Sequence, residues 1–271
     1  MSKLKNLLDY SPTMKITLKT EEDIQLLREG GKILANILDN LEKEVIVGAT
    51  TLDVDDKAME LMEEYGVTPM TLGYHAQFAP RPYPAATCVS VNDVVVHGIP
   101  NENPETFVEG DVVSIDVVID YKGMVVDSAR TIGVGEISDD ARRLIHITQK
   151  ALDAAIKAAQ PGKHIQDIGI AVEKVLDGAY GNIEDFCGHG VGYEIHEEPQ
   201  VPNFNTGEKG AELVPGMVIA IEPMITLGGK GVLVLPDGYT AVTEDGSLSA
   251  HMEHTVLITE NGPEKLTRSR K

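Results

Sequence analysis

The stretches VEGDVVSIDVVI (108–119) and VPGMVIAIEPMI (214–225) decide the fold, because they match each other along their whole length. Both are rich in valine and isoleucine, which predicts buried strands. Each carries a carboxylate at the same place, Asp116 in the first and Glu222 in the second. A charge in such a strand is costly unless it is paired, protonated or bound to a metal ion. The two stretches therefore indicate a duplicated strand with a polar site built into it.

The repeat extends outward from these strands. Further residue pairs recur at matching places: Gly48 and Gly162, Asp53 and Asp167, Cys88 and Cys187, His97 and His196, Asp127 and Glu253. Valine matches alone could arise by chance in short apolar strands, but the polar matches are harder to explain in that way. We infer that the chain contains two copies of one unit.

Each unit begins with two helical patterns and continues with strands. The expected helices cover 21–43, 52–66, 138–160 and 161–181, and the expected strands cover 86–99, 110–119, 124–134, 186–197, 216–225 and 251–260. We therefore expect an α+β fold in which the halves, about 20–135 and 136–262, pack around a pseudo-two-fold axis. One curved antiparallel sheet would be covered by helices on its outer face. Residues 1–19 would be a short N-terminal extension of a single domain, 1–271.

The composition excludes several classes of function. The chain has 43 acidic and 23 basic residues, and its net charge of -20 repels nucleic acid and anionic lipid. MSKLKNLLDYSP (1–12) has neither the apolar stretch nor the cleavage site of a signal peptide, so we expect a cytoplasmic protein. Two cysteines without a CxxC pair exclude a disulfide framework and a zinc finger.

The acids in the apolar strands predict a metal site. They are Asp116, Asp127, Glu222 and Glu253, and the matching strands contain only Arg130 as a possible ionic partner. Cations from solution can neutralise all four carboxylates. Four carboxylates and a histidine make an oxygen-rich ligand set whose charge balances about two divalent ions, which suggests a dinuclear site.

The stretch GHGVGYEIHEEP (188–199) could be a phosphate cradle, part of a metal site or a polar turn. The phosphate interpretation fails, because the stretch has neither GxxxxGK[ST] nor GxGxxG and its surroundings are acidic. We interpret it as a strand in which a twist or bulge at Gly190 or Gly192 lets His189 and His196 face one cleft. His97, His189 and His196 are assigned to the site because they lie at or near duplicated positions. The remaining histidines are assigned structural roles: His75, His146, His164, His251 and His254.

Together these residues resemble a known family. The motifs that carry the resemblance are HGIP at His97, IDV at Asp116, DSART at Asp127, GHGVG at His189, HEEPQVP at His196, IEPM at Glu222 and MEHTVLIT at Glu253. They occur in the order found in methionine aminopeptidases of the short bacterial type I form, and the similarity runs from about Thr20 to Gly262. The interval between His189 and Glu222 leaves no room for the helical insertion of the type II form.

The resemblance implies the pita-bread fold and specific roles for residues. Asp116, Asp127, His189, Glu222 and Glu253 would hold two divalent ions, with Asp127 and Glu253 bridging them. A metal-activated hydroxide would release methionine from nascent or newly made proteins whose second residue is small and uncharged. His97, His196 and Glu222 would be the catalytic residues: His97 holds the peptide nitrogen, His196 stabilises the oxyanion, and Glu222 also relays a proton. An oxygen-rich site with one imidazole accepts Mn, Fe, Co or Zn, so the ligand set does not identify the metal.

The substrate pocket departs from the family pattern. The YHGYP-like approach of relatives is extended here to YHAQFAPRPYP (74–84). Ile195 stands where relatives often have an aromatic residue, and Tyr239 stands near a frequent tryptophan. We expect Ile195 and Tyr239 to form the substrate pocket for a methionine side chain together with Cys88 and Tyr83. This pocket would lie beside His97 and His196.

Two other functions remain as alternatives. One is an Xaa-Pro peptidase of the same fold, although those enzymes usually carry an additional N-terminal domain. The other is a peptide-binding module without catalysis, which would leave the buried acids without a metal at considerable cost. The expected partners are peptide N-termini and, transiently, the ribosome, with no stable nucleic acid or membrane binding, and the expected state is a monomer.

Overall fold

A computed structural model of the chain describes residues 15–76 and 79–269. Residues 1–14 of the predicted N-terminal extension, and two residues of the extended 74–84 segment, lie outside this description. The described helices are α1 (Glu21–Leu41), α2 (Thr51–Tyr65), α3 (Asp139–Ala158) and α4 (Ile165–Leu176). None of them is long and apolar enough to cross a membrane.

Side-chain N-caps precede α1, α2 and α3. Thr20 and Thr50 each accept a hydrogen bond from the backbone of the third helical residue, and Ser138 does so for α3. Gly66 ends α2 in the left-handed conformation, with φ of 65°. α4 is shorter than expected at both ends: residues 161–164 contain a turn and a β-bridge at His164, and Asp177 ends the helix in the left-handed conformation, with φ of 47°.

The strands of the first half are built around one long hairpin. They are β1 (Thr68–Pro69), β2 (Cys88–Val91), β3 (Val94–Val96), β4 (Val112–Tyr121) and β5 (Met124–Gly133). β4 and β5 pair without interruption over their full length, and β2 and β1 pair with β4 on its other edge. Every one of these pairings is antiparallel, as predicted.

The second half has more and shorter strands. They are β6 (Gly181–Asn182), β7 (Gly188–Gly190), β8 (Glu197–Val201), β9 (Val218–Ile221), β10 (Met224–Thr226), β11 (Val232–Val234), β12 (Ala241–Thr243), β13 (Ser249–His251), β14 (His254–Thr259) and β15 (Gly262–Lys265). β9 pairs with β14 and β7, whereas β10 pairs with β13 and β6. The expected single strands 216–225 and 251–260 are therefore each divided in two.

Side-chain hydroxyls join the halves where β5 meets β13 and β14. The Thr255 hydroxyl accepts from the Asp127 amide at 2.9 Å and donates to the Asp127 carbonyl at 2.7 Å. The Ser128 hydroxyl donates to the Glu253 carbonyl at 2.8 Å, and the Glu253 amide donates to Ala129. This seam explains why the expected single curved sheet is divided into separate hydrogen-bonded sheets: side chains replace much of the backbone ladder between its two halves.

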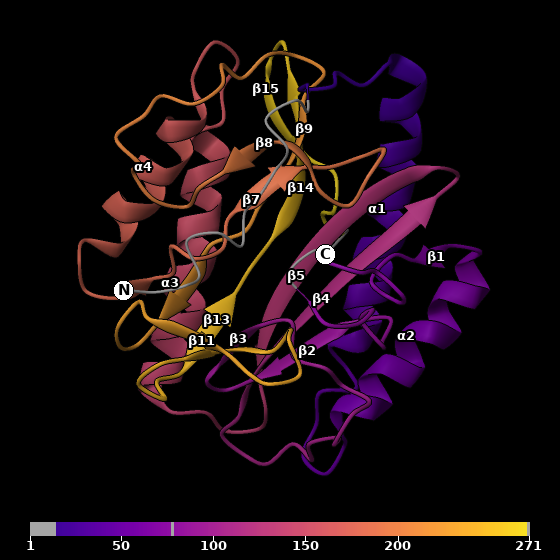
Figure 1. Ribbon diagram of the computed structural model, residues 1–271, viewed down its shortest axis with the longest axis vertical. Helices are drawn as coiled ribbons and strands as arrows, with labels where there is room; N and C mark the ends of the chain where they lie inside the picture. Colours follow the sequence, from indigo (N-terminus) through magenta and orange to yellow (C-terminus); the bar gives the residue numbers. More distant parts are fainter. Residues whose placement is uncertain (1–14, 77–78, 270–271) are drawn as a thin grey trace.

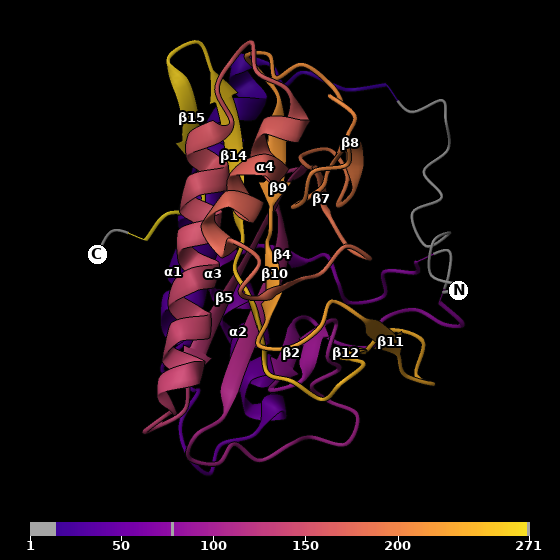
Figure 2. The same cartoon turned by 90° about the vertical axis from the view of Figure 1, so that its left-hand side faces the viewer.

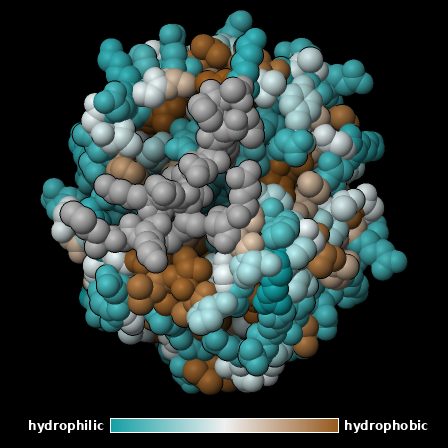
Figure 3. Space-filling model, viewed as in Figure 1, coloured by the Kyte–Doolittle hydropathy of each residue, from teal (hydrophilic) through white to brown (hydrophobic). Residues whose placement is uncertain are grey.

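Helices and hairpins lie on opposite sides of the long strands. Figure 1 shows α1 and α2 beside β4 and β5, and α3 and α4 beside the strands of the second half. In Figure 2, α1 and α3 lie on one side of β5, β10 and β14, while β2, β8 and β12 lie on the other. Two apolar cores lie between the helices and the strands, and the one beside α1 and α2 also contains second-half residues such as Val191, Ile195 and Leu257. Polar side chains cover most of the face in Figure 3, and apolar ones gather there in separate patches.

The duplicated residues outside the strands have the same local structure. Gly48 and Gly162 both have positive φ, 90° and 78°, so both occupy a conformation that favours glycine. Asp53 and Asp167 each accept the amide of the residue that precedes their helix, at 2.7 and 2.8 Å. The sequence repeat therefore reflects repeated structure beyond the apolar strands.

Candidate metal centre

The carboxylates of the first half lie on adjacent strands. Asp116 on β4 pairs with Ala129 of β5, and Asp127 on β5 pairs with Val118 of β4. Since alternate residues of a strand share a face, Asp116 and Asp127 lie diagonally on the same face of the hairpin. Cys88 of β2 pairs directly with Asp116 from the other edge.

The carboxylates of the second half lie where strands are interrupted. Glu222 follows β9 and precedes Pro223, and Glu253 lies between β13 and β14. The same register holds before and after the gap, so Glu222 falls opposite Glu253. Pro223 has no amide hydrogen for the ladder, and the Asn203 side chain donates to the Glu222 carbonyl at 3.0 Å.

His189 on β7 completes the group. Its Nε2 atom lies 3.4 Å from Oε1 of Glu222 and 3.9 Å from Oδ2 of Asp127. Ligand atoms of Asp127, His189 and Glu253 lie within 4.8 Å of one another. The ring nitrogen Nδ1 is 3.0 Å from the Gly190 carbonyl, a contact that leaves Nε2 free to act as a ligand.

The donor atoms suit a divalent cation. Asp127, His189 and Glu253 are buried. Within the described part of the chain, one oxygen of each of Asp116, Asp127 and Glu253 is buried without a hydrogen-bond partner. Buried polar atoms normally have partners, and carboxylate oxygens with one imidazole are ligands for divalent metals.

The electrostatics of the centre favour the binding of a cation. Burial raises the pKa of Asp116 to about 6. Burial, and then the carboxylates of Asp116 and Glu222, raise the pKa of Asp127 well above its usual value. The pKa values of Glu222 and Glu253 are raised well above theirs for the same reasons, burial first. Burial lowers the pKa of His189 to about 4, so this imidazole is neutral and able to ligate at neutral pH.

His196 lies beside His189, but not on a continuous strand as expected. The chain turns between β7 and β8, and the strand register shifts between Gly188 and Gly190. The centroids of the two imidazole rings lie 4.4 Å apart, with His189 before this turn and His196 at its end. The expected strand 186–197 was therefore wrong, while the expected irregularity at the glycines is present.

His97 approaches from the first half. It directly follows β3 and has a φ of 60°, an unusual conformation for a residue with a side chain. Its ring packs edge-on against Phe186 with centroids 5.5 Å apart. Among the described residues its Nδ1 atom is buried without a partner, and burial lowers its pKa to about 4. Strained backbone of this kind is common at functional sites.

The predicted pocket residues separate into two places. Tyr83, Cys88 and Tyr239 pack together in a small apolar cluster that also includes alanines of the extended 74–84 segment. Ile195 packs instead in the core beside α1 and α2. Ile195 is buried in this core, whereas the next residue, His196, lies beside His189, so the bend at 192–196 separates the two side chains.

Three residues near the centre were not predicted. The Nε2 atom of His251 lies 3.7 Å from Oε2 of Glu222, although this histidine was assigned a structural role. The Tyr74 hydroxyl lies 2.9 Å from Nδ1 of His196, and Asn203 contacts Glu222 as described. The position of His251 two residues before Glu253 was a usable signal. The family resemblance placed the 74–84 segment, which begins with Tyr74, at the substrate pocket, but no sequence pattern pairs Tyr74 with His196 or Asn203 with Glu222.

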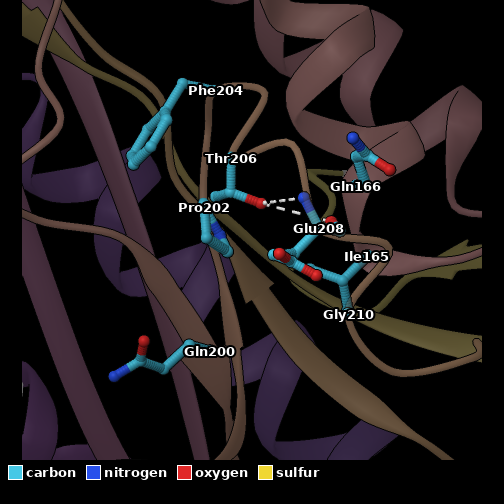
Figure 4. Close-up of a pocket in the computed structure, with 8 residues that line it drawn as sticks. All are labelled: Ile165, Gln166, Gln200, Pro202, Phe204, Thr206, Glu208 and Gly210. Atoms are coloured by element: carbon cyan, nitrogen blue, oxygen red, sulfur yellow. Dashed lines mark hydrogen bonds between the residues drawn. The ribbon is translucent and has the colours of Figure 1, made fainter.

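A separate pocket lies away from the carboxylates. Figure 4 shows it between Gln166 near the start of α4, Gln200 on β8 and the loop around Phe204 and Thr206. The Thr206 hydroxyl is bonded to the backbone of Glu208 at 3.2 Å. None of the predicted site residues lines this pocket, so we do not assign it to the metal centre.

Comparison with known proteins gives a consistent result. A profile of metallopeptidase family M24 matches residues 25–260. The chain belongs to metallopeptidase family M24. This family M24 chain is 42% identical over 253 residues to a methionine aminopeptidase of Clostridium perfringens, covering 93% of the chain and 98% of the relative.

Solved structures of relatives agree on the fold. The crystal structure of methionine aminopeptidase from Thermotoga maritima matches with a TM-score of 0.89 and 41% identity, covering 94% of this chain and all of that one. Prolidase from Pyrococcus furiosus matches with a TM-score of 0.72 and 25% identity, and only 66% of its chain is covered. The predicted pita-bread fold and the resemblance to methionine aminopeptidases are thus confirmed, and the Xaa-Pro alternative is not favoured.

Proposed function

We propose that this family M24 peptidase removes the N-terminal methionine from peptides and newly made proteins whose second residue is small and uncharged. The single observation that carries the mechanism is the group of buried carboxylate oxygens around His189 that have no hydrogen-bond partner among the described residues. Its relatives named methionine aminopeptidase, similar over nearly their whole length, indicate the substrate.

The centre would hold two divalent ions, chosen from Mn, Fe, Co and Zn. Their ligands would be Asp116, Asp127, His189, Glu222 and Glu253. When bound, such ions polarise the scissile carbonyl and lower the pKa of water, so that a nucleophile is available near neutral pH. Asp127 and Glu253 lie at the seam between the halves, so the centre would take its ligands from both halves.

His196 would donate a hydrogen bond to the oxyanion as negative charge develops. Burial holds its pKa well below the usual value, so the ring is neutral. We assign the Tyr74 hydroxyl as donor to Nδ1, which leaves the hydrogen on Nε2. A fixed N–H donor in a site sheltered from water is well suited to stabilise an oxyanion.

His97 and Glu222 would act on the leaving side of the bond. His97 would hold the peptide nitrogen in place. Glu222, whose carboxylate lies beside His189 and His251, would relay a proton to the leaving amine. The apolar cluster of Tyr83, Cys88 and Tyr239 would receive the methionine side chain.

Metal titration beside a peptide assay tests this proposal. Protein stripped of metal and reloaded with Mn²⁺ or Co²⁺ should release methionine from Met-Ala-Ser far faster than from Met-Lys-Ser, and should leave an Ala-Pro dipeptide intact. His189→Ala should abolish both metal binding and release, because it removes the only imidazole of the proposed ligand set. His146→Ala, at an exposed position on α3, should change neither. Normal metal content and activity in His189→Ala would reject the centre.

We also propose that the enzyme acts as a cytoplasmic monomer on nascent chains, with only transient contact with the ribosome. The net charge of -20 supports this, since it opposes lasting attachment to ribosomal RNA. Sedimentation should give a monomer mass, and binding to isolated ribosomes should weaken steeply as salt is raised. A stable dimer, or salt-resistant ribosome binding, would contradict this part of the proposal.

A further inference from the structure

Residues 17–23, at the end of the N-terminal extension and the start of α1, contact the turn that carries His196. The Lys19 ammonium lies 2.6 Å from Oε2 of Glu197, and these side chains are only 1% and 9% exposed. The Thr17 hydroxyl donates to the same oxygen at 3.0 Å. A segment distant in sequence from the turn is therefore fixed to the residue that follows His196.

The Glu197 carboxylate also binds the backbone of the turn. Its other oxygen, Oε1, accepts the backbone amides of Tyr193 at 2.5 Å and Glu194 at 3.1 Å. One carboxylate thus binds the ammonium on one side and the backbone of the turn on the other. Without the cation, Glu197 would be a buried charge without a counterion, which is strongly unfavourable.

Further contacts hold the two segments together. The Tyr193 hydroxyl donates to Asp23 at 2.6 Å, and the Lys19 ammonium lies 4.6 Å from the centre of the Tyr193 ring. The Lys19 amide donates to Gly216 at 2.8 Å, and a Cβ atom on Gly192 would lie 2.2 Å from Cε of Lys19. The lysine therefore passes so close to the turn that only glycine fits beside it.

We propose that residues 17–23 form a strap that fixes the turn 192–196, and that Lys19 is a positioning residue for His196. This inference rests on the proposed function, because it assumes that His196 stabilises the transition state. It gives the end of the N-terminal extension a role: the extension holds a substrate histidine from outside the duplicated halves. Lys19 contacts neither the carboxylates of the metal centre nor, in the proposed mechanism, the peptide.

The test compares Lys19→Met with Lys230→Met, since both substitutions remove a lysine ammonium group. Lys19→Met keeps most of the apolar stem and removes the buried ammonium. Lys230→Met removes an exposed pairing with Glu184, whose side chains are 62% and 40% exposed. With Met-Ala-Ser and saturating Mn²⁺, Lys19→Met should lower kcat roughly 10- to 100-fold, because small displacements of a catalytic group are costly. KM and bound metal should change little, and Lys230→Met should match the parent.

The decisive measurement is the same substitution in a His196→Ala background. If Lys19 acts through His196, Lys19→Met should cause no further loss of kcat once the imidazole is absent. An equal further loss there would overturn the proposal, since it would show a general structural role. Parental kcat in Lys19→Met alone would overturn it as well.

Two additional variants guard against poor folding. Lys19→Met/Glu197→Gln removes both buried charges, and it should restore thermal stability while kcat stays low. Tyr193→Phe removes only the bond to Asp23 at a half-exposed ring, and it should lower kcat about 2- to 5-fold. Recovery of kcat together with stability in the double variant would count against a positioning role. If the parent enzyme itself released no methionine, the proposed function would be rejected. That result differs from a parent that is active and a Lys19→Met variant that is equally active, which would reject only the role of Lys19.

Discussion

The two halves of the molecule hold their carboxylates by different means. In the first half, Asp116 and Asp127 lie inside β4 and β5, which pair without a break. In the second half, Glu222 and Glu253 lie at interruptions between β9 and β10 and between β13 and β14. The sequence repeat alone would suggest that the four positions are equivalent, but only the first two are held within an unbroken backbone ladder.

In the second half, side-chain hydrogen bonds hold the carboxylate residues where the backbone ladder is interrupted. Asn203 bonds to the Glu222 carbonyl, and Ser128 bonds to the Glu253 carbonyl. The Thr255 hydroxyl bonds to both the amide and the carbonyl of Asp127 across the seam. We infer that the positions of Glu222 and Glu253 depend on a few polar side chains that can be replaced individually. Asp116 and Asp127 lie in an unbroken ladder, and Thr255 adds support to Asp127 from the other edge of β5.

The largest expected effect comes from removing a charge that the ladder holds in place. Asp116→Asn should abolish methionine release and weaken metal binding, because the amide is a poor substitute for a carboxylate ligand. The metal-free variant should nevertheless be more stable than the metal-free parent by roughly 2 to 3 kcal/mol at pH 7.5. Chemical unfolding with and without Mn²⁺ measures both effects.

The pH dependence of this difference follows from the pKa of Asp116. Burial raises that pKa to about 6, so the folded state binds the proton more tightly than the unfolded state. The stability contribution of the protonated group is complete below about pH 4 and is lost as the pH rises through about 6. The advantage of Asp116→Asn should therefore be full at pH 7.5 and vanish near pH 4. A constant advantage over this range would contradict the assignment.

A smaller effect should follow when a seam hydroxyl is lost. Thr255→Val leaves the buried amide and carbonyl of Asp127 without partners, which should cost about 1 to 3 kcal/mol in the free energy of unfolding. Thr259→Val is the matched control, because this hydroxyl on the same strand also bonds to one amide and one carbonyl, but in a partly exposed turn.

The seam also bears on domain organisation. We propose that the halves, about 20–135 and 136–262, form a single catalytic domain, so Thr255→Val should lower stability in one cooperative transition. Denaturant unfolding followed by two probes, one in each half, measures this. Separate transitions for the halves, or an equal loss in Thr259→Val, would show that the seam does not join them.

The main features of the fold could be predicted because they depend on local patterns. The helices follow from the helical spacing of their apolar residues, and the long hairpin follows from its valine and isoleucine runs. The carboxylates were found by a physical conflict, since charge at Asp116 and Glu222 disagrees with the apolar residues around it. Such conflicts are visible without knowledge of tertiary contacts.

The features that could not be predicted depend on contacts between distant segments. Pro223 stands inside the run 216–225, yet the apolar pattern on both sides led to one expected strand. The turn after Gly190 reverses the chain within a stretch whose residues also suit a strand, which sent Ile195 to the core instead of the pocket. The contacts of Lys19 with Glu197 and of Tyr74 with His196 bring together segments whose order in the chain gives no signal.

The smallest expected effect concerns the carbonyl at the strand break. Asn203→Ala removes the hydrogen bond to the Glu222 carbonyl. The next residue, Pro223, has no amide hydrogen and cannot donate to a neighbouring strand. Loss of such a supporting contact should weaken metal affinity about 10-fold, measured by calorimetry on metal-free protein. Asn40→Ala is the matched control, because Asn40 also donates to a backbone carbonyl, at 2.8 Å, but within α1.

The outcome for Asn203 separates two accounts of the second half. If side chains replace the missing ladder, Asn203→Ala should weaken metal binding while Asn40→Ala leaves it unchanged. If the apolar packing of β9 and β10 alone fixes Glu222, both variants should bind metal like the parent. The second result would mean that the halves hold their carboxylates in the same way, in spite of the interruption at Pro223.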